Sequence, residues 1–82
     1  MSDIFGRKLR AYRKLKNLTQ IELAERLNVS VAIIGSLERG TRTPTPQQVE
    51  EIARALQTSE DELFGRVPKS LDVDPTSGSG YV

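Results

Sequence analysis

Histidine and cysteine, which carry much of the chemistry of enzymes, are both absent from this chain of 82 residues. The sequence therefore has no thiolate and lacks the commonest general base and zinc ligand. Its acidic clusters, Glu50-Glu51 and Glu60-Asp61-Glu62, resemble neither a calcium loop nor a spaced pair of carboxylates. We expect no enzyme, no bound metal and no cofactor.

The chemistry that remains is the binding of an anion by positive charge and hydrogen-bond donors. Residues 1–46 hold nine Lys and Arg against four Asp and Glu, whereas residues 47–82 hold three against seven, and the formal net charge is +1. This division can steer an anionic polymer toward one face of a nearly neutral molecule. Gln20 adds a side-chain donor beside the free amides that open an expected helix.

Two short helices joined by a tight turn are expected to position these donors. Thr19 and Glu22 have the spacing of a capping box, so the first of these helices starts at Thr19. Asn28 ends it because Asn tolerates left-handed backbone, and Ser30 is expected to cap the next helix, which stops at Gly40. Helices joined by so short a turn cross steeply, and the second can protrude into a DNA major groove.

Three further helices are expected to complete an all-α domain. One runs over residues 3–16 and ends at Asn17 in left-handed geometry, and the others open with capping boxes at Thr45 and Ser59. The apolar positions with helical spacing, which we expect in the core, are Phe5, Leu9, Tyr12, Leu23, Ala24, Leu27, Val29, Ile34, Leu37, Val49, Ile52, Ala53, Leu56, Leu63 and Phe64.

An ordered set of residues between about residues 5 and 64 resembles a known family. The set comprises Arg13, Leu18-Thr19-Gln20, Leu23-Ala24, Val29-Ser30, Ile34, Glu38-Arg39-Gly40, Pro44 and Ile52-Ala53-Arg54-Ala55-Leu56. It is similar to the lambda-repressor-like helix-turn-helix domains of phage repressors, Cro proteins and xenobiotic-response-element regulators of bacteria. The resemblance implies a compact five-helix bundle with its second and third helices as the helix-turn-helix. It also implies a sequence-specific regulator of transcription that binds double-stranded DNA, and we expect a repressor.

The resemblance assigns base reading to the outer face of the third helix. The family reads bases from the positions that are Val31, Ala32 and Ser36 here, often with Gln, Arg or Asn. None of these three side chains makes the paired hydrogen bonds that distinguish guanine or adenine. They offer contacts with thymine methyls and one hydrogen bond from Ser36, while Gly35, expected to face outward, allows close backbone approach. Specificity would then depend on DNA shape, unless this face only packs within the protein.

Phosphate contacts and one ion pair follow from the same resemblance. The expected phosphate-contacting residues are Thr19, Gln20, Arg39, Arg42 and Thr43. For Arg42, a loop arginine that contacts only solvent is an alternative of equal weight to a phosphate contact. Arg13, in the first helix, and Glu38, at the end of the third, match a family pair that ties these two helices together, so we expect a structural ion pair.

The function and the oligomeric state each leave an alternative open. A protein-interaction module on the same fold is the alternative to DNA binding. The smooth face of the third helix, with Ile33 next to Val31 and Ala32, could contact a protein, and exposed Ile21 and Leu15 could enlarge that face. The resemblance implies a symmetric homodimer on a palindromic site. Its expected seam is the fifth helix, with Leu63 and Phe64, or the segment after it. No small-molecule effector is expected.

Length and composition fit one small domain, which we expect over residues 1–65. The hydrophobic share is 37%, and no apolar run approaches the roughly 20 residues of a membrane span. We expect no signal peptide, no membrane association and a cytoplasmic location at the nucleoid. Residues 66–82 contain proline, glycine and small polar residues without periodicity, so they are expected to form a disordered tail.

Overall fold

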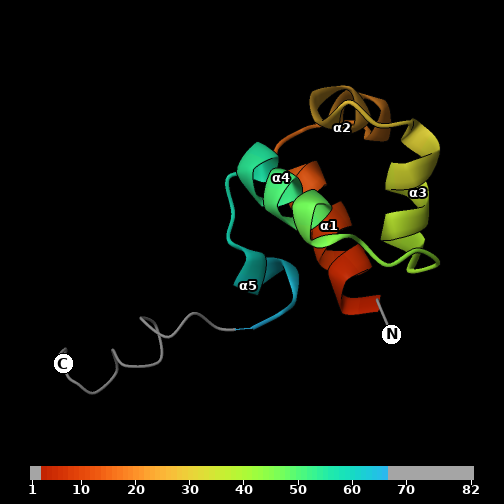
Figure 1. Cartoon of the computed structure of the whole chain (residues 1–82). Helices are drawn as coiled ribbons and strands as arrows, with labels where there is room; N and C mark the ends of the chain where they lie inside the picture. The colour runs from red at the N-terminus through yellow and green to blue at the C-terminus, as the bar shows by residue number, and fades with distance from the viewer. Residues whose placement is uncertain (1–2, 67–82) are drawn as a thin grey trace, which may run out of the picture.

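The computed structural model describes residues 3–66, which form five α-helices and no strand. In chain order the helices are α1 (Asp3–Leu15), α2 (Gln20–Leu27), α3 (Val31–Arg39), α4 (Pro46–Leu56) and α5 (Glu60–Leu63). α1 packs against α3 and α5, α2 packs against α3 and α4, and α4 also contacts α5. Figure 1 shows α3 at one edge of this bundle. The prediction of an all-α, five-helix fold is confirmed.

The core takes its side chains from every helix. The buried apolar residues are Phe5, Leu9, Leu18, Leu23, Ala24, Ile34, Leu37, Val49, Ile52, Ala53, Leu56 and Leu63. The remaining expected core positions, Tyr12, Leu27, Val29 and Phe64, are partly buried against this cluster. The Phe64 ring lies 5.1 Å from the Phe5 ring, so α5 closes the bundle against α1. Helical periodicity therefore located the core correctly.

Capping side chains set the start of three helices but not of α3. The Thr19 hydroxyl accepts from the Glu22 amide, and the Glu22 carboxylate accepts from the Thr19 amide. The same reciprocal box opens α4 and α5, as predicted. Ser30 occupies the N-cap position of α3 in extended backbone, as predicted, but its hydroxyl makes no capping bond. The Ile33 amide instead donates to the Ser30 backbone carbonyl at 3.1 Å.

Left-handed residues end the first three helices where the sequence predicts them. Asn17 and Asn28 both have φ of 59°, and Gly40 has φ of 79°. α1 stops at Leu15, one residue earlier than expected. Gln57 also has a positive φ, 57°, and ends α4 in the same way, which we did not expect of a glutamine.

A close contact between backbones fixes the position of α3 on α1. A methyl group on Gly6 would lie 2.4 Å from the Glu38 carbonyl oxygen and 2.7 Å from that of Leu37. Only a residue without a Cβ lets the two helices approach so closely. This contact holds the C-terminal end of α3 against α1 and brings the side chain of Glu38 within reach of Arg13.

Two expectations about the chain as a whole have different outcomes. The expected tail over residues 66–82 lies, except for Arg66, outside the described residues, so the domain boundary at residue 65 stays a prediction. Between residues 3 and 66, none of the helices has both the length and the apolar character needed to cross a membrane.

Candidate nucleic-acid interface

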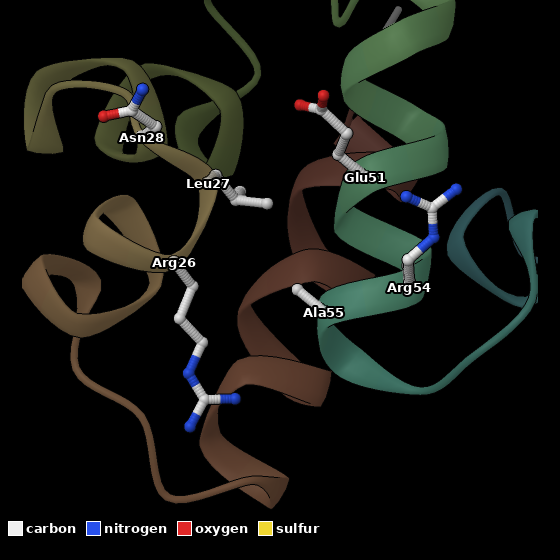
Figure 2. A pocket seen from close by; sticks show the side chains of 6 residues that line it. All are labelled: Arg26, Leu27, Asn28, Glu51, Arg54 and Ala55. Atoms are coloured by element: carbon white, nitrogen blue, oxygen red, sulfur yellow. The ribbon is translucent and has the colours of Figure 1, made fainter.

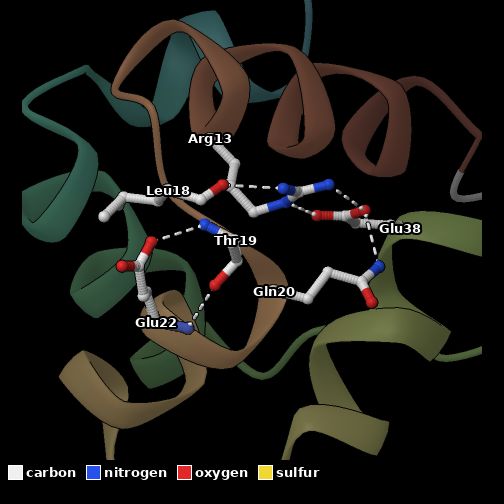
Figure 3. A network of polar contacts seen from close by, with 6 residues as sticks. All are labelled: Arg13, Leu18, Thr19, Gln20, Glu22 and Glu38. Atoms are coloured by element: carbon white, nitrogen blue, oxygen red, sulfur yellow. Dashed lines mark hydrogen bonds and ion pairs between the residues drawn. The ribbon is translucent and has the colours of Figure 1, made fainter.

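A buried ion pair joins α1 to the end of α3, as Figure 3 shows. Arg13 Nε donates to Glu38 Oε2 at 2.6 Å, and Arg13 Nη2 donates to Glu38 Oε1 at 3.2 Å. A third bond runs from Arg13 Nη1 to the Leu18 carbonyl oxygen at 2.8 Å. The two side chains are only 10% and 5% exposed. The expected structural pair is thus present, and it also holds the turn before α2.

Gln20 connects α2 to the same carboxylate. Its Nε2 donates to Glu38 Oε1 at 3.0 Å, so Glu38 accepts three hydrogen bonds from two side chains. An amide nitrogen carries two protons, and this bond uses one of them. The Glu38 network, which consists of Arg13, Gln20 and Glu38, therefore orients the side chain that we expected on a phosphate and leaves it one proton to donate.

The start of α2 has fewer free amides than an uncapped helix. The capping box uses the amides of Thr19 and Glu22, so those of Gln20 and Ile21 are the ones left at the positive end of the helix. Thr19 accepts the bond from Glu22 through its hydroxyl oxygen, and its hydroxyl proton is therefore free to be donated to an anion.

The outer face of α3 carries the three expected base-reading positions. Val31 is 42% exposed, Ala32 is exposed and Ser36 is half-buried. Ser36 Oγ donates its proton to the Ala32 carbonyl oxygen at 2.6 Å, so the expected hydrogen bond from Ser36 to a base is already used within the helix. In this arrangement Ser36 offers a base only an acceptor.

Gly35 differs from the expectation. Helical spacing turns it outward, but the residue is buried, because the side chain of Arg39 lies over it. Its backbone is therefore covered, and the direct approach of Gly35 to DNA that we expected is wrong for this arrangement of Arg39.

The segment after α3 extends this surface. Arg39, Arg42 and Thr43 are all exposed. Thr41 closes the end of α3, since its amide and its hydroxyl both donate to the Ser36 carbonyl oxygen, at 3.0 and 3.3 Å. Because Gln20 reaches Glu38, the start of α2 and the end of α3 lie together. The fold thus places Gln20 beside the end of α3, and the contacts of all the expected phosphate-contacting residues with DNA stay predictions.

A second candidate location is the open cleft between α2 and α4, with a volume of about 560 Å³. Figure 2 shows Arg26 and Arg54 pointing away from each other at its edges, so they do not converge on one ligand. On α4, Arg54 is paired with Glu50 and Glu51 accepts a bond from Gln47. Within residues 3–66, no group of three or more acidic residues is placed to hold a metal ion.

Several apolar residues of the expected protein-binding surface are exposed, and whether they form one surface stays a prediction. Leu15, Ile21 and Val31 are 71%, 59% and 42% exposed, but they belong to three different helices. Ile33 is half-buried and packs against the core, so it adds little to a protein-binding face of α3. Leu63 is fully buried at 0% exposure, and its expected place in a dimer seam is wrong.

A pair of short helices joined by a tight turn, with the second at the edge of the bundle, defines a helix-turn-helix domain. In such domains the second helix of the pair is the one that enters the major groove of a DNA duplex.

Comparisons with known proteins agree with this class. A model of the helix-turn-helix family matches residues 9–63. The chain is 45% identical over 62 residues to YazB of Bacillus subtilis, an uncharacterized HTH-type transcriptional regulator, with 76% of this chain and 90% of that protein covered. It is 36% identical over 66 residues to the control protein C.SmaI of Serratia marcescens, with 80% of this chain and 79% of that protein covered.

A solved structure supports the same assignment. The restriction-modification controller protein C.AhdI from Aeromonas hydrophila is similar with a TM-score of 0.73 and 33% sequence identity, over 77% of this chain and 96% of that chain. The chain belongs to the helix-turn-helix family and is a DNA-binding transcriptional regulator.

Proposed function

We propose that this regulator is a repressor that binds a specific duplex site, with α3 in the major groove and the start of α2 on the phosphate backbone. The observation that carries the proposal is the Glu38 network, which joins α1, the start of α2 and the end of α3 through hydrogen bonds. One carboxylate thus holds the base-reading helix α3 and the phosphate-binding start of α2 in a fixed position relative to each other. Recognition of a duplex requires such a fixed position, because phosphate contacts set the register of the base-reading helix.

The phosphate contacts in this proposal come from four side chains. Gln20 donates its second amide proton and Thr19 its hydroxyl proton, while the amides of Gln20 and Ile21 add the positive end of α2. Arg42 and Thr43, both exposed after α3, contact the next stretch of backbone. These contacts position the protein without reading sequence.

Val31 and Ala32 meet thymine methyl groups in the groove, and Ser36 accepts one hydrogen bond from a base. DNA shape supplies a further part of the specificity, since these contacts alone distinguish few bases. No catalytic step, metal or effector is part of the proposal.

Selection of bound duplexes from a random pool, repeated at several salt concentrations, tests the proposal. We expect an enriched sequence whose affinity falls as salt rises, because each neutralised phosphate contributes about 0.9 to the slope of log K against log salt. If the protein binds no duplex at low salt and a protein partner is isolated with it instead, the chain is an interaction module on the same fold.

Gln20→Ala tests the docking geometry. We expect weaker binding to selected and unselected duplexes alike, because a hydrogen bond to a phosphate is lost, while the salt slope stays that of wild type, because glutamine carries no charge. Gln47→Ala is the matched control, since Gln47 is an exposed glutamine in the first turn of α4 whose side chain bonds to Glu51. Equal isotherms for the two variants would contradict the proposed placement of α2.

We further propose that two copies bind a palindromic site, at the nucleoid in the cytoplasm. Beside α5, Ile4 is 55% exposed and Phe64 is half-buried, so this end of the bundle offers the apolar surface that Leu63 does not. Paired half-sites about one helical turn apart in the selected sequences would support a symmetric dimer, and single half-sites would contradict it.

A further inference from the structure

Arg39 is the side chain in α3 best suited to read a guanine. The sequence of the helix is VAIIGSLER, in which Arg39 is the one member of the group Arg, Lys, Asn and Gln that reads purines with paired hydrogen bonds. Val31 and Ala32 have no donor, and Ser36 gives its hydroxyl proton to a carbonyl of its own helix. Direct contact from the other outer positions therefore cannot select a guanine.

The side chain of Arg39 runs back along the outer face of α3. A methyl group placed on Gly35 would lie 3.1 Å from Arg39 Nη1 and 3.9 Å from its Cζ, so the guanidinium covers Gly35 directly. Helical side chains lean toward the N-terminus, and residues four apart lie one above the other. The charged group is thus carried about one turn toward the part of a recognition helix that contacts base edges.

Glycine at position 35 makes this arrangement possible. A Cβ at 3.1 Å from Nη1 is closer than ordinary contact, so a methyl group there would push the guanidinium a few tenths of an ångström away from the helix, and a larger side chain would push it further. Gly35 is also buried although it faces outward, because the guanidinium is its cover. A glycine inside a helix lowers helix stability relative to alanine. At position 35 the missing Cβ leaves room for the guanidinium of Arg39 to lie against the helix.

The donors of Arg39 are not committed to a carboxylate. The three ion pairs within residues 3–66 are formed by Arg13, Arg54 and Arg66. Arg39 takes part in none of them and is exposed. Its planar guanidinium therefore keeps a pair of parallel N–H groups that match the O6 and N7 acceptors of guanine.

We infer that Arg39 determines specificity, and that its guanidinium, seated on Gly35, reads one guanine in the major groove. The sequence alone placed Arg39 on a phosphate, whereas the geometry points to a base edge. This inference rests on the proposed docking of α3, and it identifies the direct contact that the other outer positions lack.

The test measures the affinity of each variant for a selected duplex and for a panel in which each base pair is replaced in turn. We expect wild type to lose roughly 5- to 150-fold in affinity when one G·C pair of a half-site is replaced. Arg39→Ala should bind the selected duplex more weakly than wild type by the same factor. On the duplex in which that G·C pair is replaced, the variant and wild type should have equal affinity. Arg42→Ala is the matched control and should weaken binding to every duplex by one common factor, with a lower salt slope.

Gly35→Ala provides a second variant that keeps the fold, because alanine is the better helix former and the atom it meets is the mobile end of a side chain. It should retain or raise resistance to urea while it reduces discrimination at the same base pair as Arg39→Ala.

Two results would overturn the inference and are distinguishable from each other. If Arg39→Ala behaves like Arg42→Ala, with equal losses on all duplexes and a lower salt slope, Arg39 contacts a phosphate and the proposed function stands. If wild type itself binds no duplex in a salt-dependent manner, the proposed function and the inference both fail.

Discussion

Replacing Glu38 with alanine should destabilise this domain far more than a typical loss of a charged residue. The carboxylate accepts bonds of 2.6 and 3.2 Å from Arg13 and one of 3.0 Å from Gln20. Without it, the Arg13 guanidinium, which is 10% exposed, keeps only its bond to the Leu18 carbonyl oxygen. A charge buried without its partner cannot recover its lost hydration.

The expected magnitude follows from this burial. Removing one partner of a buried ion pair costs about 3 to 5 kcal/mol, whereas an exposed pair contributes about 0 to 1 kcal/mol. A domain of this length has a free energy of unfolding of about 4 to 12 kcal/mol. Glu38→Ala should therefore remove about a quarter or more of the free energy of unfolding.

Urea unfolding followed by circular dichroism measures the effect, with Glu50→Ala as the matched control. Glu50 pairs with Arg54 at 3.1 Å, but the two side chains are 61% and 74% exposed, so its loss should cost less than about 1 kcal/mol. The double variant Arg13→Met with Glu38→Leu should be more stable than Glu38→Ala, because it leaves no charge buried. If Glu38→Ala and Glu50→Ala unfold within about 0.5 kcal/mol of each other, the reasoning from burial is refuted.

Two further predictions concern stability. Gly6→Ala places a methyl group 2.4 Å from the Glu38 carbonyl oxygen, so α1 and α3 must separate. We expect the variant to lose cooperative thermal unfolding. A melting temperature like that of wild type would show that the contact is not required. The hydroxyl of Thr58 and the amide of Ser59 lower the pKa of Glu62 below its ordinary value of 4.5, so their stabilisation is present above that value and is lost as pH falls through the lowered pKa. Urea titrations between about pH 6 and pH 3 should show a shallower loss of stability for Glu62→Gln than for wild type, and parallel curves would contradict this.

Local signals in the sequence were sufficient for much of the fold. The capping boxes at Thr19, Thr45 and Ser59 and the left-handed ends at Asn17 and Asn28 all formed as predicted. Each depends on hydrogen bonds or backbone preferences within a few residues, so nearby residue types are enough to predict it.

Two other local predictions failed because the conformation of a side chain decided the outcome. Ser30 has the right residue type for a cap, but the Ile33 amide bonds to its carbonyl and not to its hydroxyl. Gly35 has the spacing of an exposed residue, but the conformation of Arg39 covers it. Residue type and spacing do not say which rotamer a long side chain adopts.

By itself, the sequence determined the helices, most of their ends and most of the core, because these depend on periodicity and on neighbours along the chain. Only the tertiary structure decided which donors remain free for DNA. Glu38 lies 25 residues from Arg13 and 18 from Gln20, so their bonds exist only after α1, α2 and α3 have packed. The sequence assigned Leu63 both to the core and to a dimer seam, and packing decided between them, because Leu63 is fully buried within the bundle.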